Sequence, residues 1–262
     1  MSASVLKLIA LITMMIDHSA IALDGYWTVS VTPGSARLYW AMRAVGRAAF
    51  IIYAYFIAEG CRKTHDMRKY LLRLGIFALV SEVPFDFLFQ NMKYVNTWKH
   101  LTFLNFTDQN VFFTLFLGAL AIYLWQLRPV KTKRLALGNA EIFGYSLANF
   151  PLAALNFLIA LCPVALAQFL RTDYDWRGAG FIFLLYLLRK RPLQIAAVAA
   201  FSFYLYYGAG AYSWWLVAGG CAAGLLLAMY NGRRGFRAKW FFYAAYPLHL
   251  LILAAIFRAI VK

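Results

Sequence analysis

The sequence predicts an all-α fold, a polytopic bundle of transmembrane helices with about nine spans. The first observation is composition: the 262 residues are 63% hydrophobic and only 14% charged, with a mean hydropathy of +0.64. A soluble domain of this length could not hide so much apolar surface. The second observation is that the apolar residues gather in stretches long enough to cross a bilayer, separated by short basic loops.

The spans are expected to follow one another in a single domain, residues 1–262, because no repeat, linker or low-complexity tract divides the chain. Each range is a long apolar run bounded by charged or turn-forming residues. The sixth and seventh ranges are short for a full crossing. The predicted spans are about 5–23, 41–60, 70–90, 109–126, 143–169, 177–189, 192–207, 212–230 and 239–258.

The distribution of basic residues predicts the orientation. Most of them lie in the loops after the second, fourth, sixth and eighth spans, and cytoplasmic loops carry such an excess of lysine and arginine. The N-terminus is therefore predicted to be cytoplasmic and the C-terminus to lie outside, which an odd number of spans also requires. The loops in question carry Arg62, Lys63, Arg68, Lys69, Arg128, Lys131, Lys133, Arg134, Arg189, Lys190, Arg191, Arg233, Arg234, Arg237 and Lys239.

The net charge of +16 is thus explained by topology and by contact with anionic membrane lipids, and no nucleic-acid partner is expected. The three cysteines are scattered and show no disulfide framework and no metal-ligand spacing. No metal site is expected.

Asp17 and His18 lie inside the first span, and ionisable groups at membrane depth usually mark a reaction centre, a relay or a permeation path. At 1.5 Å of rise per residue they fall in the outer half of the membrane. Histidine suits general-base catalysis, and a carboxylate can orient it. Adjacent helical residues point about 100° apart, so Asp17 need not touch His18, and Glu82 or Asp86 of the third span is a better candidate to orient it.

Further polar residues are predicted at a similar depth in neighbouring spans. Arg43 and Arg47 share one face of the second span and are expected to neutralise Asp17, Glu82 or Asp86. Asn110 opens the fourth span, and His249 is a second intramembrane histidine in the last span. This pattern alone allows a water-accessible catalytic pocket, a structural ion-pair cluster that holds helices together, or the proton relay of a transporter or flippase.

Several ordered motifs resemble the TraX family of membrane proteins. They cover most of the first half of the chain and then the last span. The motifs are Leu6-Lys7-Leu8-Ile9-Ala10 through Met15-Ile16-Asp17-His18, Gly46-Arg47-Ala48-Ala49-Phe50, Ile57-Ala58-Glu59-Gly60, Tyr70-Leu71-Leu72-Arg73-Leu74, Ser81-Glu82-Val83-Pro84-Phe85-Asp86, Asn110-Val111-Phe112-Phe113-Thr114-Leu115 and Tyr246-Pro247-Leu248-His249-Leu250.

This resemblance implies an integral acetyltransferase of the bacterial inner (cytoplasmic) membrane. It implies acetyl-CoA as the cytosolic co-substrate and an acceptor amine or hydroxyl on the far side, either a peptide such as a pilin N-terminus or a cell-envelope sugar. His18 is then the candidate catalytic residue, with Asp17 beside it. Arg47, Glu82, Asp86 and Asn110 would shape the pocket, to which the residue pattern adds Arg43 and His249.

Three points of mechanism follow from these expectations. Arg47 or Asn110 is expected to stabilise the developing oxyanion. Basic residues of the cytoplasmic loops, Arg62 and Lys63 among them, are expected to hold the phosphates of the donor. The sequence leaves open whether transfer is direct or passes through an acetyl-histidine.

Overall fold

A computed structural model describes residues 1–27, 33–90, 108–127 and 150–260. Within these ranges the chain forms nine α-helices and one short π-helical segment, and the only β-type pairing is an isolated bridge between Gln109 and Thr172. The prediction of an all-α bundle is therefore confirmed. The helices are α1 (Ala3–Trp27), α2 (Pro33–Lys63), α3 (Met67–Phe85), α4 (Val111–Leu127), α5 (Phe150–Phe169), α6 (Asp175–Leu187), α7 (Arg191–Tyr206), α8 (Ser213–Ala228) and α9 (Lys239–Ile260), with the π-helix η1 (Asp86–Gln90) directly after α3.

Four of the described helices, α1, α2, α5 and α9, are long and apolar enough to cross a bilayer, and α4 and α8 are shorter apolar helices. Many large apolar side chains point outward from the bundle, among them Leu79 and Phe169, which are 67% and 82% exposed. Such a surface suits lipid rather than water. The chain is a membrane protein with several helices that could cross the bilayer. Its orientation and the total of nine crossings remain predictions, and α6, with 13 residues, is the shortest candidate.

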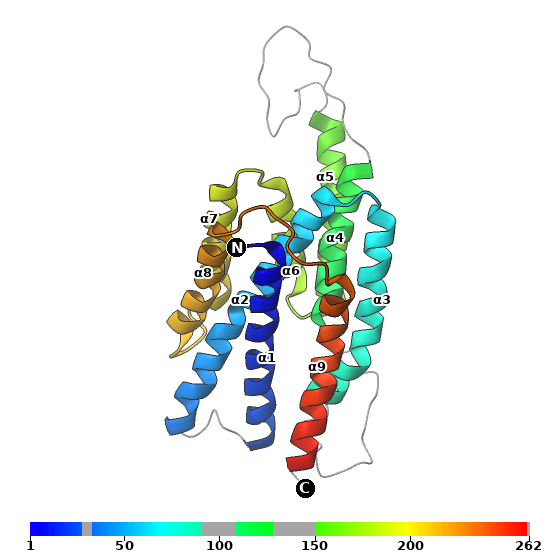
Figure 1. Cartoon of the computed structure of the whole chain (residues 1–262). Helices are drawn as coiled ribbons and strands as arrows, with labels where there is room; N and C mark the ends of the chain where they lie inside the picture. The colour runs from blue at the N-terminus through cyan, green and yellow to red at the C-terminus, as the bar shows by residue number, and fades with distance from the viewer. Residues whose placement is uncertain (28–32, 91–107, 128–149, 261–262) are drawn as a thin grey trace.

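Helix α2 runs from one edge of the bundle toward its middle and packs against α1, α4, α6 and α8 (Figure 1). The other flank of α1 packs against α9, and α9 also contacts α3 and η1. Helices α1 and α9 run in the same direction, so that the N-terminus and the end of α9 lie toward opposite ends of the bundle (Figure 1). Helix α1 therefore presents one face to α2 and another to α9.

Small residues allow the helices to approach closely, as is usual in membranes. Gly219 of α8 lies against the backbone of α2, since a Cβ at this position would fall 1.8 Å from the carbonyl oxygen of Ala44. Gly118 of α4 has the same role against Ile182 of α6, where a Cβ would lie 2.8 Å from the Ile182 Cβ. These contacts bring α8 close to α2 and α4 close to α6.

The end of α3 is irregular, and this irregularity shapes the site. Pro84 lies inside α3 and has no backbone N–H to donate, and the π-helix η1 follows at Asp86. This segment places the Phe89 ring against His18 of α1, and the Phe85 ring packs against Phe89. The predicted third span, 70–90, thus corresponds to α3 followed by η1.

Candidate functional site

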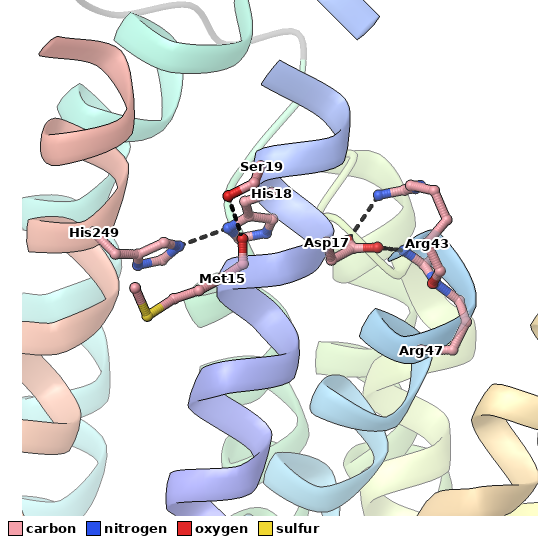
Figure 2. Close-up of polar contacts among 7 residues, drawn as sticks. All are labelled: Met15, Asp17, His18, Ser19, Arg43, Arg47 and His249. Atoms are coloured by element: carbon pink, nitrogen blue, oxygen red, sulfur yellow. Dashed lines mark hydrogen bonds and ion pairs between the residues drawn. The ribbon is translucent and has the colours of Figure 1, made fainter. Parts of the chain in front are cut away.

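The Asp17 carboxylate is bound by both arginines of α2. Arg43 Nη1 donates to Asp17 Oδ2 at 2.7 Å, and Arg47 Nη2 donates to Oδ1 at 2.6 Å (Figure 2). Arg47 Nε also donates to the carbonyl oxygen of Arg43 at 2.9 Å, which fixes the Arg47 guanidinium against its own helix. Of the partners that the sequence left open for the arginines, the structure selects Asp17.

Gly46 makes this ion-pair cluster possible. It lies between Arg43 and Arg47 on α2, and a Cβ there would fall 2.2 Å from the Cβ of Asp17. No real side chain fits at that distance. Helices α1 and α2 therefore meet at Gly46, and Asp17 lies directly over it.

His18 points to the opposite side of α1, toward α9 (Figure 2). Its Nδ1 lies 2.6 Å from Nε2 of His249, and the two rings are nearly parallel, with centroids 4.9 Å apart and planes 12° apart. The rings of Phe89 and Tyr246 contact His18 edge-on, at 5.3 and 6.1 Å between centroids. The expectation that Glu82 or Asp86 orients His18 is replaced by a contact with His249.

A cavity of about 210 Å³ adjoins both groups. His18, Asp17 and Arg43 contribute its polar lining together with Asp173 of the loop between α5 and α6. This loop is held at the start of α4, where the backbone N–H of Gln109 donates to the Arg171 carbonyl at 2.9 Å. The remaining lining residues are mostly apolar or aromatic: Met14, Ile21, Gly46, Ala49, Phe50, Tyr53, Phe85, Phe89, Val111, Leu115 and Tyr174.

A second, larger cavity of about 530 Å³ lies at the N-terminal side of α1. Its lining combines basic side chains with a dense set of aromatic rings, and Met14, Tyr53, Val111 and Leu115 line both cavities. The two cavities are therefore neighbours along α1. The basic residues are Lys7, Lys63, Arg73, Arg234 and Lys239, and the aromatic ones are Tyr53, Phe56, Tyr70, Phe112, Tyr230, Phe236, Phe242, Tyr243 and Tyr246.

Lys7 lies on α1 within the larger cavity, with its Nζ 5.1 Å from the centre of the Phe56 ring. Lys7 was not predicted as a site residue, because a single lysine near the end of a span is common. Its position eleven residues before His18 on one continuous helix was the available signal. At 1.5 Å per residue the two residues are separated by roughly 16 Å.

Glu82 and Asn110 form a separate buried cluster that lines neither cavity. The Asn110 amide donates to Glu82 Oε2 at 2.5 Å and to the Ala78 carbonyl at 2.8 Å, and its Oδ1 accepts from the backbone N–H of Phe112 at 2.9 Å. Asn110 therefore caps the N-terminus of α4 and ties it to α3. Asp86 is fully buried, and its backbone N–H donates to the Glu82 carbonyl, so it belongs to the α3–η1 junction and not to the cavity lining.

This arrangement corrects two expectations about individual residues. Arg47 or Asn110 was expected to stabilise an oxyanion, but neither lines the cavity that contains His18, and Asn110 is engaged in capping α4. The donors of Arg43 are better placed, because Arg43 lines the cavity that His18 lines.

Arg62 and Lys63, the two basic residues expected to contact the donor, lie in different surroundings. The Arg62 guanidinium donates to the carbonyls of Leu185, Tyr186 and Leu188, so it caps the end of α6 and lines neither cavity. Lys63 lines the larger cavity and pairs with Glu59 at 2.6 Å. Across the part of the chain that the structure describes, no group of three His, Cys, Asp or Glu side chains is placed to hold a metal.

Comparisons with known proteins found a family and a relative that match nearly the whole chain. The sequence profile of the family described as TraX protein matches residues 2–257. The chain is 30% identical over 264 residues to a protein of Dichelobacter nodosus named "Probable fimbrial assembly protein FimC, serogroup H1", an alignment that covers 97% of this chain and 95% of the relative. No solved structure matches the chain. With the profile matched over nearly its whole length, the chain belongs to the TraX protein family.

Proposed function

We propose that this protein is a multi-pass enzyme of the bacterial cytoplasmic (inner) membrane that transfers an acetyl group from acetyl-CoA to an acceptor on the other side. The observation that carries the proposal is the pair of adjoining cavities. One is basic and aromatic, the other contains His18, and the two share lining residues.

The larger cavity suits a donor with phosphates at one end and a thioester at the other. Lys7, Arg73, Arg234 and Lys239 supply positive charge at its rim and wall, and lysine and arginine bind phosphate through charge-assisted hydrogen bonds. The aromatic rings give surfaces for an adenine base and a pantetheine arm. The roughly 16 Å along α1 from Lys7 to His18 favours a long ligand whose reactive end reaches the smaller cavity.

The smaller cavity suits the acceptor and the chemical step. His18 would take the proton of the acceptor as the acceptor attacks the thioester carbonyl. Arg43 lines the same cavity with one guanidinium nitrogen bound to Asp17, and its other donors would stabilise the developing oxyanion. Asp17 would hold Arg43 in place and take no direct part in the reaction.

The acceptor is proposed to be an amine or hydroxyl at the outer face, and a peptide amine is the first to test. The support is the name of the relative, a probable fimbrial assembly protein, because fimbriae are built of protein subunits. A cell-envelope sugar is the second class of acceptor. The cavity of about 210 Å³ is large enough for a terminal residue but not for a folded domain.

Purified protein incubated with radiolabelled acetyl-CoA and a short peptide with a free N-terminus tests the proposal. Wild type and Ser19→Ala are expected to label the peptide, because within the described residues the Ser19 hydroxyl donates to the Met15 carbonyl of its own helix. His18→Gln is expected to reduce labelling by roughly 100-fold or more. Equal labelling by His18→Gln would remove His18 from catalysis. Uptake of solutes by proteoliposomes without acetyl-CoA, and without any labelling, would favour a proton-coupled transporter or flippase instead.

A further inference from the structure

We infer that His249 is a positioning residue that fixes the tautomer of His18, so that Nδ1 of His18 carries the proton and Nε2 is the free base. The structural part of this inference stands on hydrogen-bond geometry alone. Its effect on rate rests on the proposed function.

A chain of two hydrogen bonds joins α9 to α1. His249 Nδ1 lies 2.9 Å from the carbonyl oxygen of Ala245, one turn earlier in α9. His249 Nε2 lies 2.6 Å from His18 Nδ1 (Figure 2). Both nitrogens of His249 and the Nδ1 of His18 thus have identified partners.

The chemistry of the partners determines which nitrogen carries each proton. A carbonyl oxygen only accepts, so His249 Nδ1 must be the protonated nitrogen. A neutral imidazole has one N–H, and His249 Nε2 must therefore accept. The donor in the contact between the rings is then Nδ1–H of His18, which leaves Nε2 of His18 with its lone pair.

The opposite assignment would require protons on both nitrogens of His249. That imidazolium would be almost fully removed from solvent, since His249 is only 4% exposed, and Asp17, next to His18 on α1, already binds two arginines. A buried charge without a counter-ion is costly. The stable arrangement is therefore the neutral pair in which Nδ1–H of His18 donates to Nε2 of His249.

Aromatic contacts hold both rings in this arrangement. Phe89 of η1 and Tyr246 of α9 lie edge-on to His18, and Tyr246 also contacts His249 with centroids 5.4 Å apart. Within the described residues no hydrogen-bond partner engages His18 Nε2, and His18 lines the smaller cavity. His249 itself does not line that cavity, so it acts through His18.

This arrangement completes the proposed reaction. The neutral amine attacks the thioester carbonyl, the new C–N bond forms, and the amine proton passes to His18 Nε2. The C–S bond then breaks, and the proton leaves Nε2 for the thiolate, giving the acetylated amine and free CoA thiol. While His18 is cationic, its Nδ1–H remains bonded to His249 Nε2, which stabilises the charge.

Nitrogen-15 NMR of protein labelled at histidine tests the tautomer without any activity. The His18 signals are identified by their loss in His18→Gln. In wild type, Nδ1 of His18 is expected to show the shift of a protonated nitrogen and Nε2 that of an unprotonated one. In His249→Phe, which keeps a ring against His18 but has no acceptor, the proton is expected to move largely to Nε2. His65→Gln, which changes an exposed histidine, is expected to leave the His18 signals unchanged.

Kinetics supply the second readout. His249→Phe is expected to lower kcat by roughly 100-fold with the KM for acetyl-CoA nearly unchanged, and His249→Gln, whose side-chain oxygen can accept from Nδ1, is expected to recover at least tenfold of that loss. Wild-type protein with the His18 proton on Nε2 would overturn the inference, as would an unchanged tautomer in His249→Phe. The predicted tautomer in a protein that transfers no acetyl group would instead count against the proposed function and leave the role of His249 intact.

Discussion

Asp17→Asn is the change that tests the α1–α2 ion-pair cluster most sharply. It keeps the shape of the side chain and one acceptor oxygen but removes the negative charge between Arg43 and Arg47. Asp17 contacts Arg43 at 2.7 Å and Arg47 at 2.6 Å. The side chains of Arg43, Arg47 and Asp17 are only 20%, 11% and 11% exposed. Two charged side chains would then remain beside each other without the carboxylate that binds both.

The expected loss follows from these two contacts. A hydrogen bond to a charged group contributes about 1.5–3 kcal/mol, and removing one partner of a buried ion pair costs about 3–5 kcal/mol. Since asparagine retains one acceptor, we expect Asp17→Asn to lower the free energy of unfolding by about 3 kcal/mol. A neutral polar contact within a membrane would account for only about 0.6 kcal/mol.

Unfolding in mixed micelles, followed by circular dichroism during an SDS titration, measures this difference. The control is Asp175→Asn, which breaks the more exposed pair with Arg177 at 2.7 Å and is expected to cost about 1 kcal/mol or less. Replacing Asp17, Arg43 and Arg47 together by Asn, Gln and Gln is expected to restore at least half of the loss, because no unpaired charge remains. An Asp17→Asn protein as stable as wild type to within about 0.5 kcal/mol would refute the reasoning.

Three further changes test other parts of the structure. Gly46→Ala is expected to cost about 1–3 kcal/mol of stability by forcing Asp17 off α2. Gly224→Ala, whose Cβ would lie 3.4 Å from the nearest side chain, should cost nothing. Thermal unfolding in detergent compares the two variants, and equal effects would contradict the close approach at Gly46. Arg234→Gln is expected to raise the KM for acetyl-CoA about fivefold, equivalent to about 1 kcal/mol. Arg233→Gln, on the same loop but outside the larger cavity, should leave this KM unchanged. Steady-state kinetics with both variants measure the difference. A single cysteine at Lys190 in an otherwise cysteine-free protein is expected to react with an impermeant maleimide only from the cytoplasmic side, and labelling from outside would reverse the predicted orientation.

Much of the fold is predictable from the sequence because apolar runs of this length have few alternatives to a transmembrane helix. The predicted first and last spans, 5–23 and 239–258, correspond closely to α1 and α9. The second span was predicted to begin at residue 41, but α2 begins at Pro33, because proline is well suited to the first position of a helix even where the following residues are less apolar. For the predicted span 143–169, the structure describes a helix from Phe150, and residues 143–149 lie outside the described residues.

The candidate site was only partly predictable. The spacing of Arg43 and Arg47 indicated one helix face, and the 100° step indicated that Asp17 and His18 point apart, as they do. Which helix packs against His18 could not be read from the chain, because His249 is 231 positions away and no local pattern states that α9 is the neighbour of α1. The pairing of Glu82 with Asn110 was not predictable for the same reason, because their hydrogen bond depends on the packing of α3 against α4.

The larger cavity had no sequence signal of its own. Its basic and aromatic residues come from α1, α2, α3, α4 and α9 and from the loop before α9, and each alone resembles an interfacial or packing residue. Only the packing of these elements makes them one surface. Lys7 illustrates this, since the neighbouring Phe56 lies on a different helix.

Acetyl transfer across the membrane of sealed proteoliposomes tests most directly the central claim, that the protein moves an acetyl group from a donor on one side to an acceptor on the other. Protein is reconstituted with an acceptor peptide trapped inside, labelled acetyl-CoA is added outside, and molecules whose N-terminus faces outward are the active fraction. We expect label on the trapped peptide with wild-type protein, and at most about one hundredth as much with His18→Gln. Label on the trapped peptide at the same rate with His18→Gln, or label only when donor and peptide share one side, would contradict the account.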